Sequence, residues 1–197
     1  MSPAPILQRE AAADRLRGAT RDAHDAVEHA LDWERRTASR EAYRGWLAAL
    51  HGFHRGWEPA VAAAIGDPAF LAPRFKLELL EADLRALGGM AGGAAGRVPA
   101  WRDTLVLGDR AAAWGSLYVL EGSMLGGRIV ARRVAATLGH ASRYHAAYGA
   151  ETGAMWRDVR ARLERELVDE GARDRAAEAA RATFAALGSW LAVDFAR

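Results

Sequence analysis

The sequence predicts an all-α fold, because apolar residues recur at helical spacing along most of its 197 residues. Alternating runs of β-branched residues, which would indicate strands, do not occur. The hydrophobic fraction of 51% suits a packed core rather than a disordered chain. A chain of this length has room for one good core. We therefore expect a single-domain helical bundle of about six to eight helices over residues 1–197, with residues 1–6 flexible.

The N-terminal half is expected to form three helices. The first covers about residues 7–31, where apolar residues recur on one face. The second covers about residues 40–65, and Pro59 should kink or split it because proline has no amide hydrogen to donate. The third covers residues 74–87. The glycine-rich stretch that follows, residues 88–101, is typical of a surface loop.

The C-terminal half is expected to begin with a long apolar helix over about residues 109–138. A polar turn covers residues 139–149, and two further helices follow at about 152–168 and 173–194. The sequence contains no internal repeat that would indicate a solenoid.

Composition excludes several classes of function. The net charge of +2 is too small to indicate nucleic-acid binding, and Lys76 is the only lysine among 27 basic residues. The absence of cysteine excludes disulfides, thiolate ligation and a cysteine nucleophile. The N-terminus carries charges where a signal peptide needs an apolar core, and no apolar run approaches the roughly 20 residues of a membrane span. We therefore expect a soluble cytoplasmic protein that binds neither nucleic acid nor membrane.

The first predicted helix carries a charged stripe made of Arg17, Arg21, His24 and Glu28. A histidine at the edge of a core-facing stripe can point its ring into an interior pocket, and Glu28 can accept the other ring N–H. Arg17 lies about 10 Å from His24 along the helix axis, and a guanidinium is a good partner for a carboxylate of a ligand. The alternative is an ordinary solvated face with weak ion pairs.

The stretch LEGSMLGGR, residues 120–128, places Gly122, Gly126 and Gly127 inside the long apolar helix. Each interior glycine costs a helix about 1 kcal/mol relative to alanine. Small residues, here including Ser123, let a backbone come very close to whatever lies opposite. The glycines therefore indicate either tight helix–helix packing or a helix kinked and pressed against a flat ligand.

Two polar-tipped residues on otherwise apolar faces, His54 and Trp156, are further candidates for a site. For His54, the alternative is a histidine whose hydrogen bonds are satisfied within the core or at the surface. For Trp156, the alternative is ordinary core packing.

Two stretches together resemble the haem oxygenase family, in particular the bacterial, biliverdin-forming members found beside bacteriophytochromes. LRGATRDAHDAVE, residues 16–28, resembles the proximal helix of that family. GSLYVLEGSMLGGR, residues 115–128, resembles its kinked distal helix, and TFAALGSWL at 183–191 fits more loosely. The resemblance implies a helical bundle that holds haem between the proximal and distal helices.

The resemblance also implies roles for single residues. His24 corresponds to the axial ligand of the haem iron and Glu28 to its hydrogen-bond partner. The residues implied to reach the propionates are Arg17, Arg21 and Tyr118. The residues implied to form the distal wall are Gly122, Ser123, Gly126 and Gly127.

The chain departs from the animal members of that family at Ser123, which stands where they carry an aspartate that organises water. Some bacterial members also lack the aspartate and use other polar side chains, for which His54 and Trp156 are the candidates here. The catalytic candidates are Ser123, Gly126 and His54.

The implied function is oxidative cleavage of haem b, both cofactor and substrate, by O2 to biliverdin, CO and iron. Electrons would come from an external ferredoxin or flavoprotein reductase, and a bacteriophytochrome would be an acceptor of the bilin. The alternatives are a haem carrier or sensor of the same fold that does not cleave haem, and a helical adaptor whose glycines only pack helices.

Overall fold

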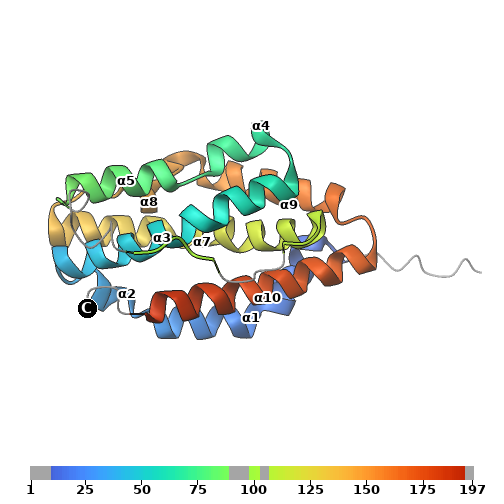
Figure 1. Ribbon diagram of the computed structural model, residues 1–197, viewed down its shortest axis with the longest axis horizontal. Coiled ribbons are helices and arrows are strands. Elements are labelled where there is room, and N and C mark those ends of the chain that lie inside the picture. Colours follow the sequence, from blue (N-terminus) through green and yellow to red (C-terminus); the bar gives the residue numbers. More distant parts are fainter. Residues whose placement is uncertain (1–9, 89–97, 103–106, 194–197) are drawn as a thin grey trace, which may run out of the picture.

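The computed structural model describes residues 10–88, 98–102 and 107–193, and every regular element within these ranges is helical (Figure 1). The prediction of an all-α fold is therefore confirmed. The expectations for residues 1–6 and for most of the 88–101 loop fall outside the described ranges. Among the described helices, none is both long and apolar enough to cross a membrane.

Six helices of ten or more residues form the bundle within the described ranges. They are α1 (Ala12–Leu31), α3 (Arg40–Ile65), α5 (Leu77–Ala86), α7 (Arg110–Leu138), α9 (Thr152–Glu166) and α10 (Glu170–Ala192). Short helices join them: α2 (Trp33–Arg36), α4 (Pro68–Leu71), α8 (Arg143–Ala146) and the 3-10 turns η1 (Ala72–Arg74) and η2 (Gly149–Glu151). The short elements lie in stretches that the sequence pattern did not resolve.

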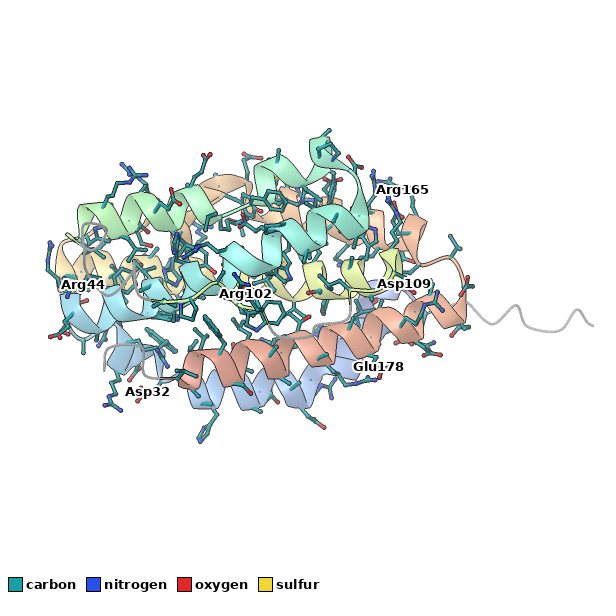
Figure 2. All side chains as sticks on the ribbon, viewed as in Figure 1. Asp32, Arg44, Arg102, Asp109, Arg165 and Glu178 are labelled. Carbon is teal, nitrogen blue, oxygen red and sulfur yellow. The ribbon has the colours of Figure 1, made fainter. Side chains whose placement is uncertain are left out.

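Local capping chemistry sets the ends of the long helices. Ser39, Asp109 and Asp169 stand before α3, α7 and α10, and each side chain accepts the backbone N–H three residues further on. Asp109 is labelled at the start of α7 in Figure 2. Gly66 and Gly139 end α3 and α7 with φ of 66° and 62°, a conformation that glycine adopts without a steric penalty. These caps explain why the predicted boundaries of α3 and α7 lie close to the observed ones.

Pro59 does not split α3, which runs unbroken from Arg40 to Ile65. Of the two predicted outcomes, a kink or a split, the split was wrong. Proline removes the N–H that would bond to the carbonyl of Arg55, four residues earlier. Both Pro59 and Arg55 are exposed, so water can reach the carbonyl that lost its partner.

Three long helices define the part of the bundle that matters for function. In Figure 1, α1, α7 and α10 all run from right to left. Helix α10 packs against both α1 and α7, whereas α1 and α7 have little direct contact with each other. The backbones of α7 and α10 touch at Gly115, where a Cβ would lie 1.9 Å from the carbonyl oxygen of Ala176. Helix α10 therefore holds α1 and α7 in one assembly while leaving them apart.

Candidate functional site

One side of α7 is open after Gly122. Every residue from Ala111 to Glu121 is buried, but beyond that point a stripe of the helix faces away from the core. Leu125 is 48% exposed and Ile129 is 54% exposed, and both share this stripe with Gly122 and Gly126. A Cβ added at Gly126 would meet no described atom within 4 Å. We call the face formed by Gly122, Leu125, Gly126 and Ile129 the open stripe.

His24 lies on α1 with its side chain 50% exposed. Its ring meets the ring of Phe184 of α10 edge-on, with the centroids 5.7 Å apart. The Nε2 atom lies 3.5 Å from Oε1 of Glu28, and the Nδ1 atom lies 3.5 Å from Oδ1 of Asp25. A carboxylate therefore stands beside each ring nitrogen at a long distance. The sequence pattern indicated Glu28 but not Asp25, because Asp25 does not share the stripe of His24 and Glu28.

A contact between α1 and α7 lies one turn before His24 and one turn before Gly122. Burial raises the pKa of Tyr118, while the charge of Arg17 and a hydrogen bond with the side chain of Thr20 act in the opposite direction. Thr20 is four residues before His24, and Tyr118 is four residues before Gly122. Because α1 and α7 run in the same direction, the turns that carry His24 and Gly122 lie in the same segment of the bundle (Figure 1).

Trp156 of α9 borders the start of the open stripe. Its ring lies 5.4 Å from the ring of Tyr118, and a Cβ at Gly122 would lie 3.6 Å from its Cη2 atom. The side chain is only partly buried. The structure thus brings Trp156, Tyr118 and Gly122 together, and Arg17 acts on Tyr118 from α1. Arg21 is exposed one turn further along α1.

Gly127 does not lie on the open stripe. It is buried, and a Cβ there would lie 2.5 Å from the carbonyl oxygen of His145 on α8. A backbone atom cannot yield to such a contact, so Gly127 serves close packing of α7 against α8. A step of one residue turns a helix by about 100°, so Gly127 and Gly126 face different directions, and a place for Gly127 in the distal wall stays a prediction.

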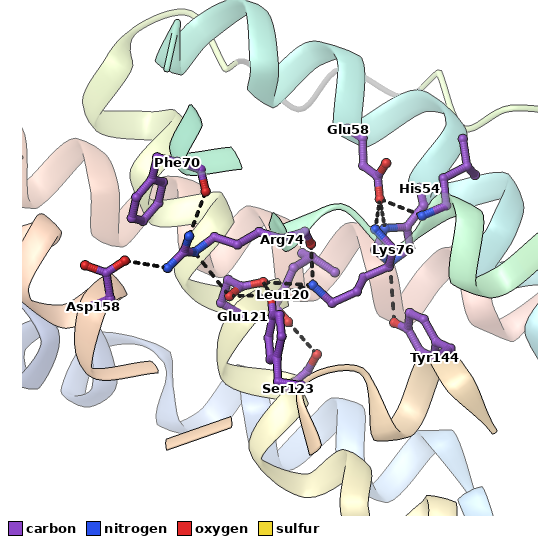
Figure 3. A network of polar contacts seen from close by, with 12 residues as sticks. His54, Glu58, Phe70, Arg74, Lys76, Leu120, Glu121, Ser123, Tyr144 and Asp158 are labelled. Atoms are coloured by element: carbon purple, nitrogen blue, oxygen red, sulfur yellow. Dashed lines mark hydrogen bonds and ion pairs between the residues drawn. The ribbon is translucent and has the colours of Figure 1, made fainter. Parts of the chain in front are cut away.

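Ser123 is exposed at the edge of the open stripe. Its Oγ donates a hydrogen bond of 2.8 Å to the carbonyl oxygen of Leu120, on the preceding turn (Figure 3). The hydroxyl oxygen keeps its lone pairs free to accept another hydrogen bond.

His54 is a buried histidine with a partner for each ring nitrogen. Its side chain is 2% exposed, its Nδ1 lies 2.9 Å from Oε1 of Glu58, and its Nε2 lies 3.3 Å from the hydroxyl of Tyr144. These contacts match the alternative of a satisfied core histidine rather than a residue that lines the open stripe. Figure 3 shows His54 in a group of polar side chains beside α7, which includes Arg74, Lys76 and Glu121.

Sequence reasoning missed this buried polar group, although two signals pointed to it. Lys76 is the only lysine of the chain, and Glu121 interrupts the apolar run of α7. Neither signal identifies its partners, because the contacts join segments that are far apart in the sequence.

Comparison with known proteins identifies one family and several structures of similar fold. A family model described as Heme oxygenase matches residues 10–192. A curated heme oxygenase of Xanthomonas campestris pv. campestris (strain 8004) is 40% identical over 114 residues, which cover 50% of this chain and 68% of the relative.

Two solved bacterial structures share the fold. The NO- and CO-bound heme oxygenase from Neisseria meningitidis superposes with a TM-score of 0.79 at 23% identity, covering 95% of this chain and 93% of that one. The heme oxygenase from Leptospira interrogans has a TM-score of 0.75 at 15% identity and covers 92% of this chain and 98% of that one. Since the family match extends across the described helices from α1 to α10, the chain belongs to the haem oxygenase family of haem-degrading enzymes.

Proposed function

We propose that the open stripe of α7 and His24 of α1 contact the two faces of one haem. The enzyme cleaves this haem with O2 to biliverdin, CO and iron. The observation that carries the proposal is the pairing of a half-exposed imidazole on α1 with an exposed, side-chain-poor stripe on α7, in the same segment of the bundle.

The open stripe suits a flat apolar ligand. Leu125 and Ile129 offer apolar side chains whose exposure to water is unfavourable by roughly 25 cal/mol per Å². Gly122 and Gly126 leave the backbone bare between them, so a planar macrocycle can approach while space remains for a small molecule at its centre. The helix accepts a loss of intrinsic stability at these glycines to keep that face clear.

His24 supplies an imidazole for the iron of the haem. Whichever ring nitrogen binds iron, the other faces a carboxylate: Asp25 beside Nδ1 and Glu28 beside Nε2. A carboxylate that accepts the remaining N–H orients the ring and strengthens the imidazole as a ligand. Bound haem supplies a redox-active iron, at which O2 is activated.

The propionates of the haem are proposed to lie toward the start of α7. Arg17 already acts electrostatically on the Tyr118 hydroxyl there, and Arg21 is exposed one turn further along α1. A guanidinium binds a carboxylate through two parallel hydrogen bonds, which fixes orientation as well as adding affinity.

Ser123 is proposed to position water beside the open stripe. Its hydroxyl accepts a hydrogen bond from water while donating to Leu120, so it holds the water at the edge of Gly122 and Gly126. Trp156 closes the same edge and limits the entry of further water.

An external donor is proposed to supply the electrons. The sequence pI of about 9.4 favours docking of an acidic partner such as a ferredoxin or a flavoprotein reductase by charge complementarity. The resemblance to members found beside bacteriophytochromes makes a bacteriophytochrome the proposed acceptor of the bilin.

The test is a titration of the purified protein with haemin, followed by ascorbate and air. We expect a Soret band of a histidine-ligated haem, which decays as biliverdin absorption appears. His24→Ala should lose the histidine-ligated spectrum and the biliverdin. His29→Ala, which alters another exposed histidine of α1, should retain both.

The other candidate functions predict different results. A stable haem complex that never yields biliverdin, even with a ferredoxin and its reductase, would indicate a carrier. No Soret change at all would overturn haem binding and return the glycines to helix packing.

A further inference from the structure

A group of buried charges meets α7 beside the start of the open stripe. Glu58, Arg74, Lys76 and Glu121 are each no more than 5% exposed (Figure 3). Removing a charged group from water costs several kcal/mol, and pairing restores that loss only with good geometry. Glu121 immediately precedes Gly122, so the group touches α7 at the turn where the open stripe begins.

Glu121 is held from two other segments of the chain. The Tyr148 hydroxyl, beside η2, lies 2.7 Å from Oε1 and 2.9 Å from Oε2 of Glu121. Lys76 donates to Oε1 at 3.2 Å, and the Nε of Arg74 lies 3.6 Å from Oε2. One carboxylate therefore ties α7 to the segment before α5 and to the segment before α9.

The acceptors around the Nζ atom of Lys76 suit a tetrahedral ammonium better than a planar guanidinium. Its Nζ donates to Glu121, to the Tyr148 hydroxyl at 2.6 Å and to the carbonyl oxygen of Arg74. Three donors on one atom match three acceptors, which a planar fork of donors does not. Of the 27 basic residues, the other 26 are arginine. Lysine stands at this position because a compact ammonium fits the three acceptors.

The backbone of Lys76 is itself fixed by α3. Oε1 of Glu58 accepts the N–H of Lys76 at 2.7 Å and the N–H of Leu77 at 3.1 Å. Helix α5 has no side-chain cap of its own, so Glu58 caps it from α3. His54 completes this arrangement through its contact with Glu58. A chain of contacts thus runs from α3 through Lys76 to Glu121 and ends at Gly122.

The open stripe makes this support necessary. Gly122 and Gly126 have no side chains to pack against a neighbour, so the stripe cannot fix the depth or rotation of α7. Backbone contacts fix the helix at Gly115, before the stripe, and at Gly127, within the length of the stripe but on another face. The contacts of Glu121 fix α7 at a third position, which is next to Gly122.

We propose that Lys76 is a positioning residue for haem cleavage: through Glu121 it holds the turn of α7 at Gly122 at one depth against the haem. The haem then meets a distal wall in a single position, and one carbon bridge is favoured for attack. The inference rests on the proposed site between α1 and α7. It assigns the buried charges a role in reaction geometry rather than in stability alone.

The experiment compares Lys76→Met with a matched control, Arg173→Met. Arg173 is another buried cation, 1% exposed, which pairs with Glu164 at 3.2 Å and joins α10 to α9. The readouts are the unfolding midpoint of the haem-free protein, the C–O stretching band of CO bound to the ferrous haem complex, and the isomers of biliverdin formed.

We expect both variants to lower the unfolding midpoint. Lys76→Met should also split or broaden the C–O band and raise the share of minor biliverdin isomers about fivefold, because small displacements change reaction geometry strongly. Arg173→Met should leave the band and the isomers as in the wild type. Glu121→Gln keeps the shape of the side chain, so it should show the same changes in weaker form even where Lys76→Met does not fold.

An unaltered C–O band and isomer pattern in Lys76→Met, or in Glu121→Gln when the first variant does not fold, would overturn the inference. Equal changes in Arg173→Met would also overturn it, because they would show a general effect of destabilisation. Failure of the proposed function is a separate outcome, since the wild-type protein would then give either no haemin spectrum or a stable haem complex that yields no biliverdin.

Discussion

The two long sides of α7 are held in opposite ways. On one side, Leu125 and Ile129 are exposed and Gly126 has no described neighbour for a Cβ. On the other side, Glu121 is tied to two other segments and Gly127 lies against the backbone of His145. The faces of α7 that carry Glu121 and Gly127 are therefore held by neighbouring segments, whereas the open stripe is bare.

This comparison shows that neighbouring glycines perform different physical tasks. Gly126 keeps space clear, while Gly127 allows two backbones to touch. Glycine thus lowers the helix propensity at both positions, at Gly126 on the face proposed for the ligand and at Gly127 where the fold needs a close contact. Because the open stripe makes few contacts, the position of α7 depends on contacts at its other faces. Substitutions at those faces should lower stability, whereas substitutions on the open stripe should affect haem binding.

The largest effect is expected from Glu121→Leu, which removes the carboxylate that Lys76 and Arg74 share. Lys76 would then lose the carboxylate it pairs with, while Arg74 would keep Asp158, and the free energy of unfolding should fall by about 3–5 kcal/mol. Chemical denaturation of the haem-free protein measures this. Glu178→Leu, at an exposed position of α10 (Figure 2), should change stability by less than about 0.5 kcal/mol. Equal losses in the two variants would contradict the claim that the buried contacts of Glu121 hold α7.

Gly127→Ala should lower the free energy of unfolding by about 1–3 kcal/mol. The reason is the distance of 2.5 Å between the new Cβ and the carbonyl oxygen of His145, which forces α7 and α8 apart. Thermal unfolding of the haem-free variant gives the value. A variant as stable as the wild type would mean that α8 moves away freely and that Gly127 is not a fixed point.

Lowering the pH should lower the free energy of unfolding through His145, whose carbonyl packs against α7 at Gly127. Burial lowers the pKa of His145 from its usual 6.5 to about 3, so the unfolded chain binds a proton that the folded chain does not between these values. Stability is present above pH 6.5 and is lost as pH falls, by roughly 1 kcal/mol between pH 7 and 5.5 from this group. Burial also lowers the pKa of His51, which acts in the same direction. Denaturant titrations at several pH values should show a shallower dependence in His145→Gln, and an unchanged slope would argue against this assignment.

The smallest effect on stability, with the opposite sign, is expected from Gly126→Ala on the open side. Alanine meets no neighbour there and favours the helix, so the free energy of unfolding should rise by about 0.5–1 kcal/mol. Haemin titration of the same variant should show weaker binding, because the methyl group occupies the space proposed for the ligand. Higher stability with unchanged haem affinity and turnover would place the ligand elsewhere.

The sequence by itself determined the six long helices and, closely, the ends of α3 and α7. Helical periodicity and caps such as Ser39 and Asp109 act within a few residues, so they can be recognised without knowing the fold. It also drew attention to two helices as candidates for the site, because His24 and the glycines after Glu121 are unusual for their local surroundings. The family match covers both helices.

Only the tertiary structure decided what each residue faces. Exposure to water at Arg55 allows Pro59 to stay within one helix, and a carbonyl on α8 gives Gly127 its packing role. Glu58 and Tyr144 satisfy His54, which the sequence left between two readings. These outcomes depend on contacts between segments that are distant in the sequence. A local sequence pattern carries no information about which distant residues form those contacts. The same reason hid the link between Lys76 and Glu121, which are 45 residues apart along the chain.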